Sequence, residues 1–372
     1  MKFKTLITNF IVFIFLFILA DVVFSNFIFK RSVDNKCYEH IDEGRFYRLR
    51  KNCFANMRFV STVDSYKVYT DQNGIRYSGK KRILKNQNLV FLGDSSTFGL
   101  GVDWKDTFSG IIEKKFPEYN IYNLGMPSYS PTVYKFILEE FIKTNKIKIN
   151  KVFVFIDLTD VSDEGTRWII HNGKPSLTTK KIVQKSPSKF SKFKKENFKG
   201  AYFAASKIRS FLRNLKKKSQ KNDIKKTNLT DGTFVGGFLY TNHKKISGCY
   251  EETQENQFWK CEGVDKGLKK IEKKITEISK IVKSIDSELY LITAPWPDTL
   301  TFGQTVFNWE DFNKRLCLEN NCDGLISMFP IFNKIKDNEN NWLENIYLKH
   351  DVHFTPRGNK LFAEEIIKKA FQ

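Results

Sequence analysis

The stretch NLVFLGDSSTFG, residues 88–99, decides the fold class of this chain. Its first part, residues 88–94, is a short apolar run that suits a strand buried on both faces of a parallel sheet. Gly93 and Gly99 then allow a tight turn from the strand into a helix. Ser95 falls at that turn, near a helix N-terminus that favours developing negative charge. The stretch therefore predicts a strand that ends with a serine at the edge of the sheet.

The rest of the chain alternates strands and helices in the same way. Further apolar runs predict strands at residues 120–125, 151–158, 288–295 and 323–329. Helices are expected at residues 107–116, 131–146, 264–284, 309–318 and 356–371. Such alternation predicts an α/β fold with a parallel sheet covered on both faces. Ligands of these sheets bind beyond the carboxyl ends of the strands.

Two further blocks lie at such ends. NLGMPSYSP, residues 123–131, follows the second strand, and its Gly125 can present a backbone N–H to an oxyanion. An ordinary Gly/Pro loop before a helix has the same composition. DVHFTPRG, residues 351–358, precedes the closing helix, and in extended backbone Asp351 and His353 project to the same side. The carboxylate can then steer the imidazole as a general base toward a serine hydroxyl, although a lone Asp-x-His is more often a loop coincidence.

Together and in this order, the three blocks resemble the SGNH/GDSL hydrolase superfamily. The similarity covers residues 88–164 and 285–370, roughly half of the chain. It implies a three-layer α/β/α flavodoxin-like domain that hydrolyses or transfers O-acyl groups. It also implies Ser95 as the nucleophile, His353 as the base and Asp351 as the partner that orients the base.

The same resemblance implies that the backbone N–H groups of Ser95 and Gly125 form part of the oxyanion hole. Two features depart from the family pattern. The aspartate stands two residues before the histidine rather than three, as in some membrane-associated polysaccharide O-acetyltransferases of the superfamily. Thr159 stands where the family has an asparagine that donates to the oxyanion, and losing one such donor costs roughly 10²–10³ in rate. The Thr159 hydroxyl can donate but has a shorter reach, so either activity is slow or the third donor comes from elsewhere.

Other polar and aromatic groups follow the third and fourth strands. Four acids match no calcium-loop spacing and are interpreted as caps of turns: Asp157, Asp160, Asp163 and Glu164. Neither a metal nor another cofactor is therefore expected. Trp296 overhangs the same predicted cleft and is a candidate for stacking on a sugar. Packing between its two neighbouring prolines is the alternative.

Composition limits the partners. The chain has 372 residues, of which 41% are hydrophobic, and its 35 Phe exclude disorder for most of it. The net charge is 62 − 41 = +21, but residues 171–230 hold 18 basic residues and two acids, or +16 of that total. They belong to a basic insertion, residues 165–262, with a predicted amphipathic helix. That helix lies on an anionic membrane, attracts an acidic glycan or packs on the domain with solvated lysines.

The N-terminal residues 6–29, LITNFIVFIFLFILADVVFSNFIF, are nearly all apolar. At about 1.5 Å per residue they are long enough to cross a hydrocarbon layer of roughly 30 Å. A cleaved signal peptide would have a shorter apolar centre and a small-x-small cleavage site, and neither is clear. An uncleaved transmembrane anchor at residues 1–31 is therefore expected, with a cleaved signal as the alternative.

The cysteines favour an oxidising compartment. Six cysteines form three near pairs without the C-x-x-C spacing of a zinc or redox site. The pairs predict three short disulfides, Cys37–Cys53, Cys249–Cys261 and Cys317–Cys322. Six buried thiols in a cytosolic protein are the alternative. Anchor and disulfides together place the domain outside the cytoplasmic membrane, periplasmic or extracellular.

Three parts are expected: the anchor, an extension at residues 32–87 with a hairpin around Asn73-Gly74, and an SGNH-like domain at residues 88–372. The predicted function is that of a serine esterase or O-acetyltransferase acting on O-acyl groups of cell-envelope carbohydrate. The expected partners are the acylated carbohydrate, a lipid surface and a membrane acyltransferase, but not nucleic acid. A lipid or thioester hydrolase is one alternative. A non-catalytic glycan-binding or assembly protein, favoured by Thr159, is another.

Overall fold

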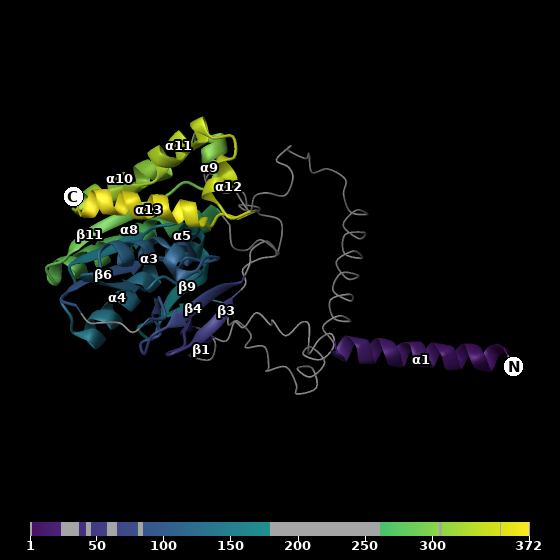
Figure 1. The fold of residues 1–372 in the computed structure, drawn as a ribbon. Helices are drawn as coiled ribbons and strands as arrows, with labels where there is room; N and C mark the ends of the chain where they lie inside the picture. Colours follow the sequence, from purple (N-terminus) through teal and green to yellow (C-terminus); the bar gives the residue numbers. More distant parts are fainter. Residues whose placement is uncertain are drawn as a thin grey trace. The chain divides into compact units, whose positions relative to one another are not determined.

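The computed structural model describes residues 2–23, 37–41, 46–57, 65–80, 85–178, 261–304, 307–349 and 351–371. Contacts divide the chain into two units. The first consists of Met1–Val33 and Ile182–Thr230, and the second of Asp34–Lys181 and Asp231–Gln372. Helix α1 (Lys2–Val23) is the described part of the first unit, and all other described elements belong to the second (Figure 1).

Helix α1 covers most of the apolar N-terminal run. Several of its large apolar side chains are exposed, among them Phe10 at 64% and Phe13 at 65%. Within the residues that the structure describes, no helix combines the length and the apolar character needed to cross a membrane. The expected anchor at residues 1–31 stays a prediction.

A mixed sheet forms the centre of the second unit. Its strands are β3 (Phe54–Met57), β4 (Tyr66–Thr70), β5 (Arg76–Tyr77), β6 (Gln87–Leu92), β7 (Tyr119–Asn123), β8 (Lys151–Phe155), β11 (Glu288–Thr293) and β12 (Gly324–Ser327). Their order in space is β12-β11-β8-β6-β7-β5-β4-β3. Strands β6, β7, β8, β11 and β12 pair in parallel. They match the five strands predicted from the sequence, which confirms the α/β class. The other three pair antiparallel, so the sheet is mostly parallel rather than wholly so.

The N-terminal extension is part of this sheet. The predicted hairpin is confirmed between β4 and β5, and Gly74 in its turn has a φ of 78°, a conformation that favours glycine. Strand β5 also pairs with β7 through Arg76 and Asn123. The extension thereby covers the edge of β7, which would otherwise present unpaired backbone groups. The sequence did not predict this join, because edge pairing uses backbone groups and leaves no side-chain pattern.

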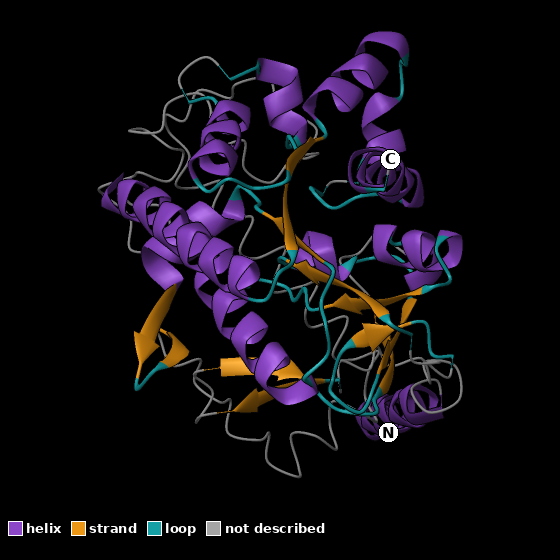
Figure 2. Ribbon diagram, turned by 90° about the vertical axis from the view of Figure 1, so that its left-hand side faces the viewer, coloured by secondary structure: helices purple, strands orange, loops and turns teal. Residues whose placement is uncertain are grey.

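Helices cover both faces of the sheet (Figure 2). On one face lie α3 (Phe108–Lys115) and α13 (Pro356–Ala370), and on the other lie α4 (Pro131–Asn145) and α8 (Cys261–Ser284). Alternate residues of β6 serve the two faces: Phe91 packs in the core that contains Phe108 and Phe362, and Val90 packs in the other. Each face of the central strand is therefore apolar, as the continuous run predicted.

The remaining described elements are shorter or lie at the rim: β1 (Tyr38–Ile41), β2 (Phe46–Leu49), η3 (Trp104–Asp106), α5 (Thr159–Ser162), the π-helical η4 (Asp163–Arg167), β9 (Trp168–His171), β10 (Lys174–Leu177), α9 (Pro297–Phe302), α10 (Trp309–Glu319), α11 (Phe329–Asn338) and α12 (Trp342–Ile346). The hairpin of β9 and β10 opens the basic insertion, where no strand was expected. Ile169 and Ile170 in β9 are both exposed, so the strand carries no alternating pattern. The predicted amphipathic helix of the insertion lies outside the described residues.

Two of the three predicted disulfides are confirmed. Cys37 and Cys53 are bonded with a Cα–Cα distance of 5.7 Å, and Cys317 and Cys322 with one of 5.1 Å. Cys249 lies outside the described residues, so its bond to Cys261 stays a prediction. Disulfides persist in oxidising compartments, and these two therefore indicate an extracytoplasmic location.

Arg76 joins the extension to the turn that follows Ser95. Its fully buried guanidinium donates hydrogen bonds to the backbone oxygens of Phe98 (2.5 Å), Gly99 (2.8 Å) and Val102 (2.6 Å). Burial lowers the pKa of Arg76 to about 10, so the group is still charged at neutral pH. Because charged donors form the stronger hydrogen bonds, one side chain of β5 fixes the backbone behind the serine.

Replacing Arg76 with methionine is expected to lower the free energy of unfolding by roughly 2–4 kcal/mol, because three buried carbonyl groups lose their donor. Urea denaturation of the two proteins measures the difference. The matched control is Arg48→Met, which removes an exposed ion pair with Glu39 and is expected to cost less than about 1 kcal/mol. An equal decrease in the free energy of unfolding in the two variants would show that the hydrogen bonds of Arg76 to these carbonyl groups stabilise the fold no more than the exposed ion pair does.

Candidate active site

Ser95 stands at a sharp strand-to-helix turn. Strand β6 ends at Leu92, and Ser95 is the first residue of α2 (Ser95–Phe98), whose N-cap is Asp94. The Asp94 carboxylate accepts a hydrogen bond from the backbone N–H of Ser96 at 2.8 Å. A Cβ on Gly93 would lie 2.0 Å from the Thr97 hydroxyl oxygen, so only glycine fits there. The turn holds Ser95 at 9% exposure at the carboxyl end of the central strand.

His353 and Asp351 reach this serine from the loop before α13. The His353 Nε2 atom lies 2.7 Å from the Ser95 Oγ atom, although 258 residues separate the two along the chain. The other ring nitrogen, Nδ1, is hydrogen-bonded to Asp351 Oδ1, which also accepts the backbone N–H of His353 at 3.0 Å. The backbone N–H of Leu348 donates to the His353 carbonyl at 2.7 Å and fixes the loop. A hydroxyl, an imidazole and a carboxylate thus lie in the order that nucleophilic catalysis requires.

The charges around His353 favour its protonated form. Burial lowers the pKa of His353, but the hydrogen bond and the negative charge of Asp351 raise it by more. The charges of Asp94 and Asp157 add to that increase, and the net pKa lies above 6.5. Burial also acts on Asp351, but its hydrogen bonds with His353 outweigh burial and hold its pKa below the usual value. Asp351 is therefore ionised and able to stabilise an imidazolium.

Asp94 is a second acid beside the serine that the sequence did not single out. Its Oδ2 atom lies 3.3 Å from Ser95 Oγ and 3.3 Å from Thr159 Oγ1. Burial, and next the charge of Asp157, raise the pKa of Asp94 to about 7. The Gly-Asp-Ser order could have indicated Asp94, because a residue directly before Ser95 in a tight turn also lies close to the serine side chain. The shorter contact of Ser95 is with His353, so the histidine is the nearer proton acceptor.

The predicted oxyanion donors are partly engaged. The backbone N–H of Gly125 donates to Asn123 Oδ1 at 3.0 Å, and the Thr159 hydroxyl lies 2.8 Å from Asp157 Oδ1. A Cβ on Gly125 would lie 2.6 Å from the backbone nitrogen of Phe98, so this loop packs tightly against α2. Ser95 opens its helix, and the N–H of a first helical residue has no acceptor within the helix. The Ser95 N–H therefore has no acceptor within α2.

Three of the four predicted capping acids are buried and accept hydrogen bonds from nearby groups: Asp157, Asp160 and Glu164. Asp157 accepts the Thr159 N–H at 2.9 Å, and Glu164 accepts the Thr132 N–H at 2.6 Å in the first turn of α4. Asp160 accepts the Tyr134 hydroxyl at 2.8 Å, and burial raises its pKa well above the usual value. Among the described residues, no group of three or more histidine, cysteine or acidic side chains is arranged to hold a metal ion.

Trp296 lies inside the protein rather than over a cleft. Its side chain is 6% exposed, and its indole N–H donates to Asp157 Oδ2 at 3.2 Å. With its ring buried in the core, Trp296 offers no open face to a sugar. The stacking role expected from the sequence is therefore not favoured, and the alternative of a packed tryptophan describes this side chain better.

A reaction that uses His353 as its general base is expected to slow as the pH drops through the pKa of His353, because a general base must be neutral. Asp94→Asn removes a negative charge that raises this pKa, so the midpoint of the acid limb should move to lower pH. Profiles of kcat/KM against pH for a small acetyl ester measure the shift. Asp311→Asn, at an exposed acid of α10, is the control and should leave the midpoint unchanged. A common midpoint for all three proteins would contradict the coupling of Asp94 to His353.

No family model and no curated protein matches this chain. Its fold matches solved structures of lipolytic G-D-S-L proteins and esterases over about 77% of its length. A lipolytic G-D-S-L protein from Veillonella parvula has a TM-score of 0.40 at 10% identity, covering 77% of this chain and 99% of that one. TesA has a TM-score of 0.40 at 8% identity, covering 76% and 97%. A catalytic mutant of Axe2, an acetylxylan esterase from Geobacillus stearothermophilus, has a TM-score of 0.40 at 12% identity, covering 78% and 96%.

Proposed function

We propose that this chain is a serine esterase or O-acyltransferase of the SGNH/GDSL type, with Ser95 as nucleophile, His353 as base and Asp351 as orienting acid. The observation that carries the proposal is the 2.7 Å contact between Ser95 Oγ and His353 Nε2, with Nδ1 of the same ring held by Asp351. Hydrogen-bond contact between a hydroxyl and a base that is itself oriented by a third group is the signature of an activated nucleophile.

The reaction proceeds in two halves. Ser95 Oγ attacks the acyl carbonyl carbon while its proton passes to His353 Nε2, and the ester C–O bond then breaks as His353 returns that proton to the leaving oxygen. Water or a sugar hydroxyl next gives a proton to His353 and attacks the acyl carbon, and the bond from that carbon to Ser95 Oγ then breaks as His353 returns the proton to Oγ. Asp351 keeps the proton of the neutral ring on Nδ1, so that Nε2 is free to accept.

Charge on the carbonyl oxygen needs donors as the tetrahedral intermediate forms. The Ser95 N–H supplies the first. Gly125 and Thr159 supply further donors once an oxyanion replaces their present partners, Asn123 and Asp157. Because Gly125 and Thr159 must first give up these hydrogen bonds, this oxyanion hole is less preorganised than one whose donors are unengaged. We therefore expect a modest turnover rate.

The substrate we propose is O-acylated carbohydrate of the cell envelope, reached from a transmembrane anchor at residues 1–31. The disulfide of Cys37 and Cys53 supports a location in an oxidising compartment outside the cytoplasm, where cell-envelope carbohydrate is found. A membrane lipid surface and a membrane acyltransferase are the proposed partners, and nucleic acid is not one. A cavity of about 220 Å³ that Gly125 helps to line carries both apolar residues and the charged groups Arg48, Lys51 and Glu140, a mixture that suits a sugar better than the acyl chain of a lipid or thioester.

A fluorophosphonate that reacts with activated serines, followed by peptide mapping, tests the proposal. The label is expected on Ser95 and is expected to be lost in Ser95→Ala and in His353→Ala. Ser96→Ala, at the adjacent buried serine, is the matched control and should still be labelled. A label on another residue would remove Ser95 as the nucleophile. Absence of any label would favour the non-catalytic glycan-binding alternative.

A further inference from the structure

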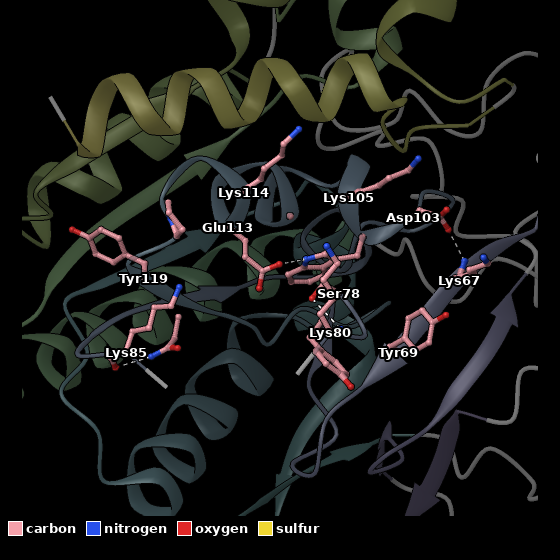
Figure 3. Close-up of a pocket in the computed structure, with 15 residues that line it drawn as sticks. Lys67, Tyr69, Ser78, Lys80, Lys85, Asp103, Lys105, Glu113, Lys114 and Tyr119 are labelled. Atoms are coloured by element: carbon pink, nitrogen blue, oxygen red, sulfur yellow. Dashed lines mark hydrogen bonds between the residues drawn. The ribbon is translucent and has the colours of Figure 1, made fainter. Parts of the chain in front are cut away.

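A second cavity, of about 550 Å³, lies on the second unit between the added strands and helix α3. Strands β4 and β5 contribute Lys67, Tyr69 and Tyr77 to its lining, and Lys105 and Lys114 come from the segment that contains η3 and α3. Figure 3 shows Lys105 and Lys114 on the side of the helix, and Lys67 and Tyr69 on the side of the strands. The triad contributes no residue to the lining, so this cavity is a separate site.

The lining of the cavity is rich in lysine, and its lysines form no ion pairs with carboxylates of the described residues. Five lysines line the cavity: Lys67, Lys80, Lys85, Lys105 and Lys114. None of them forms an ion pair with a carboxylate of the described residues. The two acids of the lining are turned to other donors, because Glu113 accepts the Trp104 indole N–H at 2.7 Å and Asp103 accepts the Lys67 backbone N–H at 2.7 Å. The lining charge is 5 − 2 = +3, and the ammonium groups are available to an anion.

Aromatic rings give the cavity an amphipathic surface. Tyr69, Tyr77 and Tyr119 are among the lining residues and are each half-buried. A tyrosine ring packs on the apolar C–H face of a sugar while its hydroxyl bonds to the sugar hydroxyls. The volume lies within the roughly 300–1,000 Å³ of small-ligand sites. The disulfide of Cys37 and Cys53, in the same extension as β4 and β5, argues for a partner found outside the cytoplasm.

We infer that this cavity binds an anionic carbohydrate, whose carboxylate or phosphate groups meet the lysines and whose sugar rings lie against the tyrosines. The inference goes beyond the proposed function, because binding here requires no reaction at Ser95. Where both are correct, the cavity holds a charged stretch of polymer on the same unit as the proposed active site.

Calorimetric titration of the full-length chain tests the inference with three saccharide probes, with inorganic phosphate, and with single-stranded DNA and anionic-lipid vesicles as competing polyanions. A short oligogalacturonate supplies carboxylates, a phosphomannan fragment supplies phosphates, and methyl-esterified oligogalacturonate is the neutral counterpart. Inorganic phosphate separates recognition of a sugar from capture of a free anion. We expect at least one charged saccharide to bind about tenfold more tightly than the neutral one, with an affinity that falls as salt rises.

The test variant is the triple substitution Lys67→Gln, Lys80→Gln and Lys105→Gln, all at exposed side chains. It should weaken the charged saccharide about tenfold, since each exposed charge contact contributes a modest share. The control removes the same charge from helix α8: Lys269→Gln, Lys273→Gln and Lys280→Gln, also exposed. Its Kd should stay within about twofold, because these lysines are not among the lining residues. Lys105→Glu alone gives a second variant that reverses one charge without altering the core.

Several results would overturn the inference. Equal weakening in the two triple variants would assign binding to overall charge rather than to the cavity. Unchanged affinity in the Lys67 triple variant and in Lys105→Glu would place binding elsewhere. Inorganic phosphate, single-stranded DNA or vesicles containing anionic lipid binding as tightly as the saccharide, with the same loss in the test variant, would remove the carbohydrate assignment. Loss of labelling at Ser95 would bear only on the proposed function.

Discussion

Ser95→Ala is expected to reduce the hydrolysis of a small acetyl ester on the order of 10⁴-fold or more, because the acyl group loses the oxygen to which it transfers. The free energy of unfolding should change by less than about 1 kcal/mol, since the hydroxyl makes few contacts apart from His353 and Asp94. Steady-state kinetics and urea denaturation on the same preparations separate the two quantities.

Ser96→Ala is the matched control for that experiment. Ser96 is the next residue of α2, is 5% exposed, and contributes its backbone N–H to the cap on Asp94. An alanine keeps that N–H, so activity should stay within a few-fold of the unaltered chain. If Ser95→Ala kept its activity and Ser96→Ala lost it, Ser96 rather than Ser95 would be the nucleophile, and the proposed mechanism would be wrong.

Asp351→Asn is expected to lower kcat/KM at neutral pH by about 10⁴. An asparagine amide placed at the same position donates to His353 Nδ1, which leaves the ring proton on Nε2. Nε2 then no longer accepts the proton of Ser95 from its position 2.7 Å away. The loss of the Asp351 charge also removes the main contribution that raises the pKa of His353, so NMR titration of the imidazole should give a lower pKa in the variant.

Asp94→Asn tells the two acids near His353 apart. Asp94 faces the serine but makes no contact with Nδ1, so its variant should lose far less activity than Asp351→Asn while still shifting the pH profile. Reversed magnitudes, with the large loss at Asp94, would make Asp94 the orienting acid and assign Asp351 to the loop alone.

The strands and the triad were predictable because their signals are local. Parallel strands buried on both faces need continuous apolar runs, and residues 89–92 of β6 show why: Leu89 and Phe91 serve one core, Val90 and Leu92 the other. Parallel strands also end at a common edge, so motifs that follow different strands are expected to meet. Ser95 follows this rule at the end of β6, whereas His353 follows helix α12 and reaches Ser95 from the loop before α13.

Tertiary partners of single side chains were not predictable in the same way. Nothing near Trp296 in the sequence indicates that its indole bonds to Asp157, 139 residues away. The engagement of the Gly125 N–H depends on the rotamer of Asn123, and that of Thr159 on Asp157. Motifs identify which residues surround a site, whereas the hydrogen bonds that occupy them depend on packing that a motif does not record.

The position of Arg76 has a practical consequence for shortening the chain. Removing residues up to 31 leaves β3, β4 and β5 in place, but cutting near residue 88, where the SGNH-like region was predicted to begin, deletes all three strands together with Arg76. The trimmed protein would expose the backbone edge of β7 and would leave three carbonyl groups near Ser95 without the donor that Arg76 supplies. Low stability or aggregation of such a fragment would then reflect the loss of these strands and of Arg76, and would not show that the protein has no activity.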